Sequence, residues 1–145
     1  MKKLMMSVVL LCLFTLVTSI VNAGPAPNLS NVQITHVGAE NTDWIEVRNI
    51  PTTTLYGQNF YIAVRFIGYP DPNRIFLYQN GSRIPTTLVT EPFAREGIGN
   101  PYTGWVYQFK VPISYGNGTI VVQADGIRGG TYYSTIYGVK AVHQP

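Results

Sequence analysis

The Asn80-Gly81 pair constrains the fold most strongly, because it lies between two stretches rich in apolar residues. A type I′ turn needs positive φ at both central residues, and Asn and Gly adopt that conformation at the least cost. Residues 75–78 and 82–84 therefore form a predicted β-hairpin, and residues 86–90 continue its second arm.

Alternating apolar and polar residues recur along the chain after residue 31, which is the pattern of strands with one buried face. Segment 91–104 holds two prolines and three glycines and is predicted to be a loop. Alternating strands separated by turns predict an all-β, antiparallel sandwich of seven to eight strands. Besides the hairpin, strands are expected at 32–37, 43–47, 59–67, 103–111, 119–125 and 131–143.

The face of each strand that carries the larger apolar residues should be buried. Trp44 shares its face with Glu46 and Arg48, so its indole is expected to point outward. The predicted core comprises Phe60, Ile62, Val64, Phe66, Leu77, Trp105, Phe109, Ile120 and Val122.

The N-terminus has the pattern of a secretory signal peptide, with Lys2 and Lys3 ahead of the apolar run 4–17. That run is shorter than the roughly 20 residues of a membrane-spanning helix. We expect cleavage after Ala23 and a secreted protein, extracellular or periplasmic, with no transmembrane segment in the mature chain. The expected parts are the signal peptide 1–23, an extended Pro-rich arm 24–31 and one β-sandwich domain 32–145.

Cleavage would change the charge and the cysteine content. Without Lys2 and Lys3 the ten basic residues become eight, against seven acidic ones, so the mature net charge is +1. Such a chain has no basic surface to neutralise a phosphate backbone, which argues against nucleic acid as a partner. Cys12, the only cysteine, would leave with the signal peptide, so the mature chain has no disulfide or thiolate.

The strand and turn pattern resembles an immunoglobulin-like (Ig-like) domain of bacterial surface and secreted proteins. The resemblance rests on Gly57-Gln58 before a core strand, the 75–84 hairpin, strand 105–111 and the run 118–125 before a Gly-rich turn. It implies a β-sandwich that acts by binding or assembly. The sequence is also faintly similar to small secreted bacterial proteins of the YolA-like kind, which implies no activity.

Few residues of this chain suit a metal site. His36 and His143 lie far apart and in no ligand-spaced motif, whereas zinc needs three or four converging ligands. Asp71 with Asn73, and Asp125 with Gly126, fit turns better than a calcium site. We expect no metal and no other cofactor.

Enzymatic function is the less favoured hypothesis. The chain has no G-x-S-x-G nucleophile motif. Glu91 and Glu96 share the loop 91–102, where charge balance explains them better than acid–base catalysis. The alternative that stays open is a small secreted hydrolase with a site near that loop and the last strand, with His36 or His143 as its base.

The aromatic residues favour a binding function, because Trp and Tyr make large contacts at a low entropy cost. Trp44 and the pair Tyr132 and Tyr133 are the candidate binding residues. We predict a non-enzymatic module that binds a protein or a glycan at the cell surface, or that associates with itself. Asn28, Asn80 and Asn117 begin glycosylation-type motifs, and we expect the last two to act as turn residues.

Overall fold

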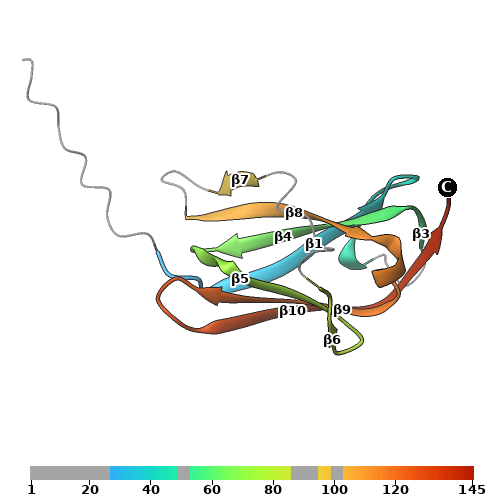
Figure 1. Ribbon diagram of the computed structural model, residues 1–145. Coiled ribbons are helices and arrows are strands. Elements are labelled where there is room, and N and C mark those ends of the chain that lie inside the picture. Colours follow the sequence, from blue (N-terminus) through green and yellow to red (C-terminus); the bar gives the residue numbers. More distant parts are fainter. Residues whose placement is uncertain (1–26, 49–52, 86–94, 99–102) are drawn as a thin grey trace, which may run out of the picture.

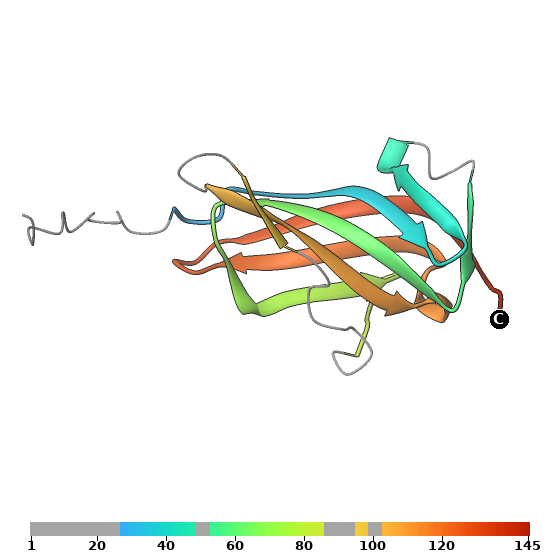
Figure 2. The same cartoon turned by 90° about the horizontal axis from the view of Figure 1, so that it is seen from above.

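The computed structural model describes residues 27–48, 53–85, 95–98 and 103–145. The predicted signal peptide and residues 86–94 and 99–102 lie outside this part of the chain. The described strands form two five-stranded sheets, which Figure 1 shows as two packed layers. Figure 2 shows their long strands running in roughly one direction, as in an aligned sandwich.

The two sheets have the following strand orders. The first sheet is β2 (Thr42–Glu46), β1 (Asn31–Ala39), β4 (Asn59–Ile67), β8 (Gly104–Pro112) and β7 (Arg95–Ile98). The second sheet is β3 (Thr54–Gly57), β10 (Thr131–His143), β9 (Gly118–Gly126), β5 (Pro70–Gln79) and β6 (Ser82–Arg83).

This strand order is that of an Ig-like sandwich. β1, β4, β8 and β7 follow the A-B-E-D order of one immunoglobulin sheet, and β10, β9, β5 and β6 follow the G-F-C-C′ order of the other. β2 and β3 are added at the edges. The predicted fold class is confirmed, with one difference: β3 pairs with β10 in parallel.

Alternation along the strands produces the core between the sheets. Phe60, Ile62, Val64 and Phe66 all point inward from β4 and are fully buried. Of the nine predicted core residues, eight are buried and Trp105 is half-buried. It lies near the start of β8, at one end of the sandwich, where Tyr69 covers it with a ring-centroid distance of 5.7 Å.

The predicted hairpin is present. Asn80 and Gly81 have φ of 49° and 81°, and β6 pairs antiparallel with β5. The described second arm is short, because the strand continues only through Arg83, and residues 86–90 lie outside the described residues.

The side chains of the three asparagines that begin glycosylation-type motifs hold turns and strands together. Asn117 accepts the Ala141 N–H at 2.8 Å and donates to the Ala141 carbonyl at 3.0 Å. Asn80 accepts the Thr119 N–H at 2.8 Å. Asn28 accepts the Arg128 N–H at 3.2 Å. These side-chain amides therefore stabilise turns and contacts between strands.

Two short strands were not predicted. β3 lies within a polar, Thr-rich stretch, and β7 lies within the segment that was predicted to be a loop. Each is the outermost strand of its sheet, so it is held by pairing with one neighbour, β10 or β8. Their formation depends on long-range pairing more than on local pattern.

The described end of the predicted N-terminal arm packs on its own sandwich. Leu29 is buried in the core, and the Ser30 N–H donates to the Ile67 carbonyl at 2.8 Å. The Tyr69 N–H donates to the Pro27 carbonyl at 3.0 Å. Among the described residues, no helix is long and apolar enough to cross a membrane.

Candidate functional site

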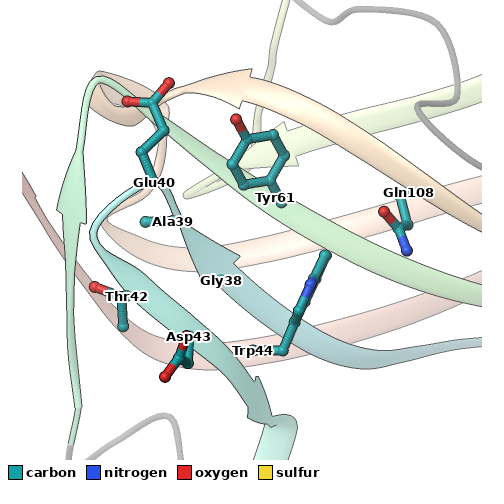
Figure 3. Close-up of a pocket in the computed structure, with 8 residues that line it drawn as sticks. All are labelled: Gly38, Ala39, Glu40, Thr42, Asp43, Trp44, Tyr61 and Gln108. Atoms are coloured by element: carbon teal, nitrogen blue, oxygen red, sulfur yellow. The ribbon is translucent and has the colours of Figure 1, made fainter.

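A hollow of about 440 Å³ lies on the outer face of the first sheet, beside the turn between β1 and β2. Figure 3 shows that its residues come from β2, β1, β4 and β8, which are neighbours in the sheet. The residues that line it are Gly38, Ala39, Glu40, Thr42, Asp43, Trp44, Tyr61 and Gln108. We call it the Trp44 hollow.

A β-bulge shapes the hollow. Val37 pairs with Ile45 and Ala39 pairs with Thr42, so two residues of β2, Asp43 and Trp44, lie opposite the single residue Gly38. A bulge of this kind changes the direction of a side chain and is common beside binding sites. Here it lets both Asp43 and Trp44 line the hollow, although consecutive strand residues normally point to opposite faces.

Trp44 packs over Gly38, which has no side chain. A Cβ built on Gly38 would lie 3.4 Å from two carbons of the indole, Cδ2 and Cε3. The Trp44 ring therefore covers the Gly38 backbone with one face, and 46% of the residue stays exposed. Tyr61 of β4 pairs with Gly38 and lies beside the indole, with 6.3 Å between the centroids of the Tyr61 and Trp44 rings.

The turn that carries Glu40 is fixed to the rest of the sandwich. Glu40 Oε2 accepts the Gln58 N–H at 2.7 Å, and its Oε1 accepts from Asn59 Nδ2 at 2.8 Å. On the other side of the turn, Thr42 Oγ1 accepts the Tyr56 N–H at 2.9 Å. The hollow is thus built on a turn that is tied to β3 and to the start of β4.

These hydrogen bonds change the acidity of Glu40. The Asn59 side chain and the Gln58 N–H lower its pKa below the ordinary value of 4.5, and the positive charge of Lys110 acts in the same direction. The charged form of Glu40 is therefore favoured in the folded chain.

A change in pH should test this arrangement. Because folding lowers the pKa of Glu40, its contribution to stability is complete above the unfolded-state pKa and is lost as the pH falls through the folded-state pKa. In urea unfolding between about pH 7 and about pH 3, the stability difference between the wild type and Glu40→Gln should therefore shrink at the acid end. Asn59→Ala should weaken this pH dependence. Identical pH profiles for the wild type and Glu40→Gln would contradict the arrangement.

The polar groups of the hollow surround its aromatic centre. In Figure 3 the carboxylates of Glu40 and Asp43 lie at its edge and point away from the indole, and the Gln108 amide lies across from them on β8. Asp43 is exposed, whereas Thr42 and Gln108 are half-buried. A flat aromatic surface surrounded by carboxylate, hydroxyl and amide groups suits a ligand with both apolar faces and hydroxyl groups.

The structure places the three predicted binding residues on three different surfaces. Trp44 lies in the hollow, and its outward orientation agrees with the sequence analysis. Tyr132 is half-buried and packs against the core, whereas Tyr133 is 61% exposed on the outer face of the second sheet. As consecutive residues of β10, they point to opposite faces and form no joint platform.

The two histidines considered as catalytic bases lie on different sheets. His36 lies on β1 in the first sheet and His143 at the end of β10 in the second. Ser134 Oγ accepts the Ile34 N–H at 2.8 Å and so connects the two sheets. No group of three or more His, Cys, Asp or Glu side chains that could hold a metal occurs in the described part of the chain. Loop residues 91–94 and 99–102 lie outside it.

Of the eight residues that line the hollow, the sequence analysis identified only Trp44. Alternation placed Tyr61 and Gln108 on the outward faces of their strands, but they meet only because β4 pairs with both β1 and β8. Gly38 within the first strand was the one local signal, because a glycine inside a strand often marks a bulge or the close approach of another group.

The chain matches a protein-family model over most of its length. A family model described as a domain of unknown function (DUF4879) matches residues 24–137, which is most of the chain. No curated protein matches the chain.

Two solved immunoglobulin structures are similar to the chain. The titin–obscurin-like 1 immunoglobulin complex matches with 11% identity and a TM-score of 0.35, covering 83% of this chain and 99% of that one. A tandem pair of titin immunoglobulin domains matches with 9% identity and a TM-score of 0.37, covering 84% and 50%. The Ig-like assignment itself rests on the strand order of the two sheets.

Proposed function

The chain belongs to the DUF4879 family, and we propose that it is a secreted, non-enzymatic binding module that holds a glycan in the Trp44 hollow. The observation that carries the proposal is the position of the indole. One face of Trp44 lies against Gly38, and nearly half of the residue is exposed.

An indole held in this way is suited to a sugar ring. The C–H face of a pyranose packs on an aromatic surface, and its hydroxyl groups point outward from the ring edge. Around Trp44, the residues Thr42, Asp43 and Gln108 supply hydroxyl, carboxylate and amide partners for such groups. The support from Gly38 and the tied turn keeps this surface in place before the ligand arrives, which lowers the entropic cost of binding.

The carboxylates of the hollow support binding over hydrolysis. A glycosidase needs a carboxylic acid whose pKa is raised so that it can protonate the leaving group. Glu40 has the opposite property, because two hydrogen bonds hold it as a carboxylate and lower its pKa. Glu40 is therefore suited to stabilising the turn. Asp43 then has no second carboxylic acid in the hollow with which it could form a catalytic pair.

Export to the outside of the cell remains part of the proposal and rests on the signal-peptide pattern of residues 1–23. A module that meets glycans would need that location. Detection of the chain in the culture medium, with an N-terminus at Gly24, is the measurement that checks it.

Replacing Trp44 should abolish most of the glycan binding. Truncation of a central aromatic residue in a binding site costs about 2 kcal/mol or more, which is about a thirtyfold rise in Kd. Affinity electrophoresis or calorimetry of the intact chain with soluble β-glucan, N-acetylglucosamine oligomers and mannan should show binding to at least one of them, and Trp44→Ala should weaken it by that factor.

A matched control is Tyr137→Ala, which removes a 70% exposed aromatic side chain from the opposite sheet and should leave neutral-glycan binding unchanged. Gly38→Val offers a second test, because a branched side chain beneath the indole would lift the ring without removing it. Equal binding by the wild type and Trp44→Ala, or no binding to any of the three glycans, would overturn the proposal. If the same surface bound a protein instead of a glycan, the proposed ligand would have to be changed to a protein.

A further inference from the structure

We infer that the outer face of the second sheet carries a second binding site, centred on Arg83, for glycans that bear carboxylate or phosphate groups. It lies on the opposite side of the sandwich from the Trp44 hollow, and it does not depend on what the hollow binds. We call it the Arg83 face.

Strand pairing brings the residues of this face together. Gln123 of β9 pairs with Tyr133 of β10 on one side and with Phe76 of β5 on the other. In the next row, Tyr78 of β5 pairs with Val121 of β9 and with Arg83 of β6. These residues point to solvent, because the intervening Leu77 and Val122 are buried in the core.

Arg83 is held in a fixed position on this surface. Its guanidinium carbon lies 3.9 Å from the centroid of the Phe76 ring, which is a cation–π contact. The ring occupies one face of the planar guanidinium, so the N–H groups at its edge remain available. A planar fork of N–H donors matches the two oxygens of a carboxylate or a phosphate.

No carboxylate neutralises Arg83 within the described part of the chain. The two ion pairs found there join Arg48 to Glu46 and Arg74 to Asp125. The two rows that make up the Arg83 face contain no acidic residue. This contrasts with the Trp44 hollow, where Glu40 and Asp43 are present.

A second donor lies in the neighbouring row. The Tyr78 hydroxyl donates to Gln123 Oε1 at 3.1 Å, which fixes the amide and leaves its Nε2 group as a donor. Tyr133 and Tyr137, which are 61% and 70% exposed, extend the aromatic surface along β10. Exposed tyrosines beside a fixed cation and an amide donor suit a polymer of sugar rings with anionic groups, because the rings pack on the tyrosines and the anions pair with Arg83.

The test measures binding of the intact chain to polygalacturonate, which carries carboxylates, to phosphomannan, which carries phosphates, and to neutral dextran. We expect at least one acidic glycan to bind more tightly than dextran, and this binding to weaken at high salt because the site is exposed. Arg83→Gln should weaken it about tenfold or more, as expected for loss of hydrogen bonds to a charged group. Whether polygalacturonate or phosphomannan binds more tightly identifies the anion.

Three control variants separate this site from general charge and from the hollow. Arg128→Gln removes the same charge from an exposed turn and should have little effect. Arg83→Lys keeps the charge but loses the planar fork, so it should bind less tightly than the wild type. Trp44→Ala should leave acidic-glycan binding unchanged. The inference is overturned if neither acidic glycan binds better than dextran, or if Arg83→Gln and Arg128→Gln weaken binding equally.

Discussion

Truncation of Phe66 to alanine should lower the free energy of unfolding by about 3–5 kcal/mol, the usual cost of removing a fully buried phenylalanine. Phe66 is 0% exposed, and its ring contacts Tyr107 edge to face with a centroid distance of 5.2 Å. It points inward from β4, the central strand of the first sheet, so the surrounding strands cannot easily close the cavity. Urea unfolding monitored by tryptophan fluorescence measures the loss.

The matched control is Tyr137→Ala, which removes an aromatic side chain of similar size from an exposed position. A surface substitution of this kind usually changes stability by less than about 0.5 kcal/mol. If Phe66→Ala lost less than about 1 kcal/mol, Phe66 could not be the buried residue described here.

The elements that follow from local sequence are those whose pattern is sufficient by itself. The Asn80-Gly81 turn needs positive φ at two adjacent residues, and this requirement is readable from the two residues alone. β4 was predicted with the bounds it has, because large apolar residues occupy every second position from Phe60 to Phe66. Inward and outward faces followed directly from this alternation.

Features that depend on pairing between distant segments were not accessible in this way. β3 joins β10 in parallel across most of the chain, and nothing in its own four residues requires that partner. The Trp44 hollow is a similar case. The outward orientation of Trp44 could be predicted, but the bulge opposite Gly38 and the neighbouring Tyr61 are properties of the register between β2, β1 and β4.

The two candidate sites also differ in how much of them the sequence could show. Arg83 lies two residues after the predicted turn, so its position on the hairpin was readable, whereas its contact with Phe76 depends on the rotamers of both side chains. Tyr132 and Tyr133 form an apparent pair in the sequence, but the two-residue period of a strand separates them. Adjacency in the sequence is therefore a poor guide to a shared surface in this fold.

Replacing Gly68 with alanine should lower stability by about 2–5 kcal/mol, the sum of backbone strain of about 1–2 kcal/mol and overpacking of about 1–3 kcal/mol. Gly68 follows β4 with φ of +83°, which L side chains rarely adopt. A Cβ there would overlap the Asn28 carbonyl oxygen and would lie 2.6 Å from the carbonyl carbon. These are backbone atoms, so a change of rotamer cannot relieve the contact.

The cost arises because the segment beside Gly68 is anchored on both sides of the contact. Pro27 accepts the Tyr69 N–H, and Ser30 donates to Ile67, so Asn28 can move only if these hydrogen bonds lengthen. Leu29, 1% exposed, would be drawn out of the core by the same movement. A substitution next to β4 would thus act on the core through residues 27–30.

Gly129→Ala separates the two contributions. Gly129 has a similar φ of +95°, but nothing lies within 4 Å of its Cβ position, so alanine there should cost only the strain of about 1–2 kcal/mol. Urea unfolding of both variants then gives the steric contribution at Gly68 as the difference between them. Equal losses would mean that the segment 27–30 moves freely and that its packing against Gly68 does not stabilise the sandwich.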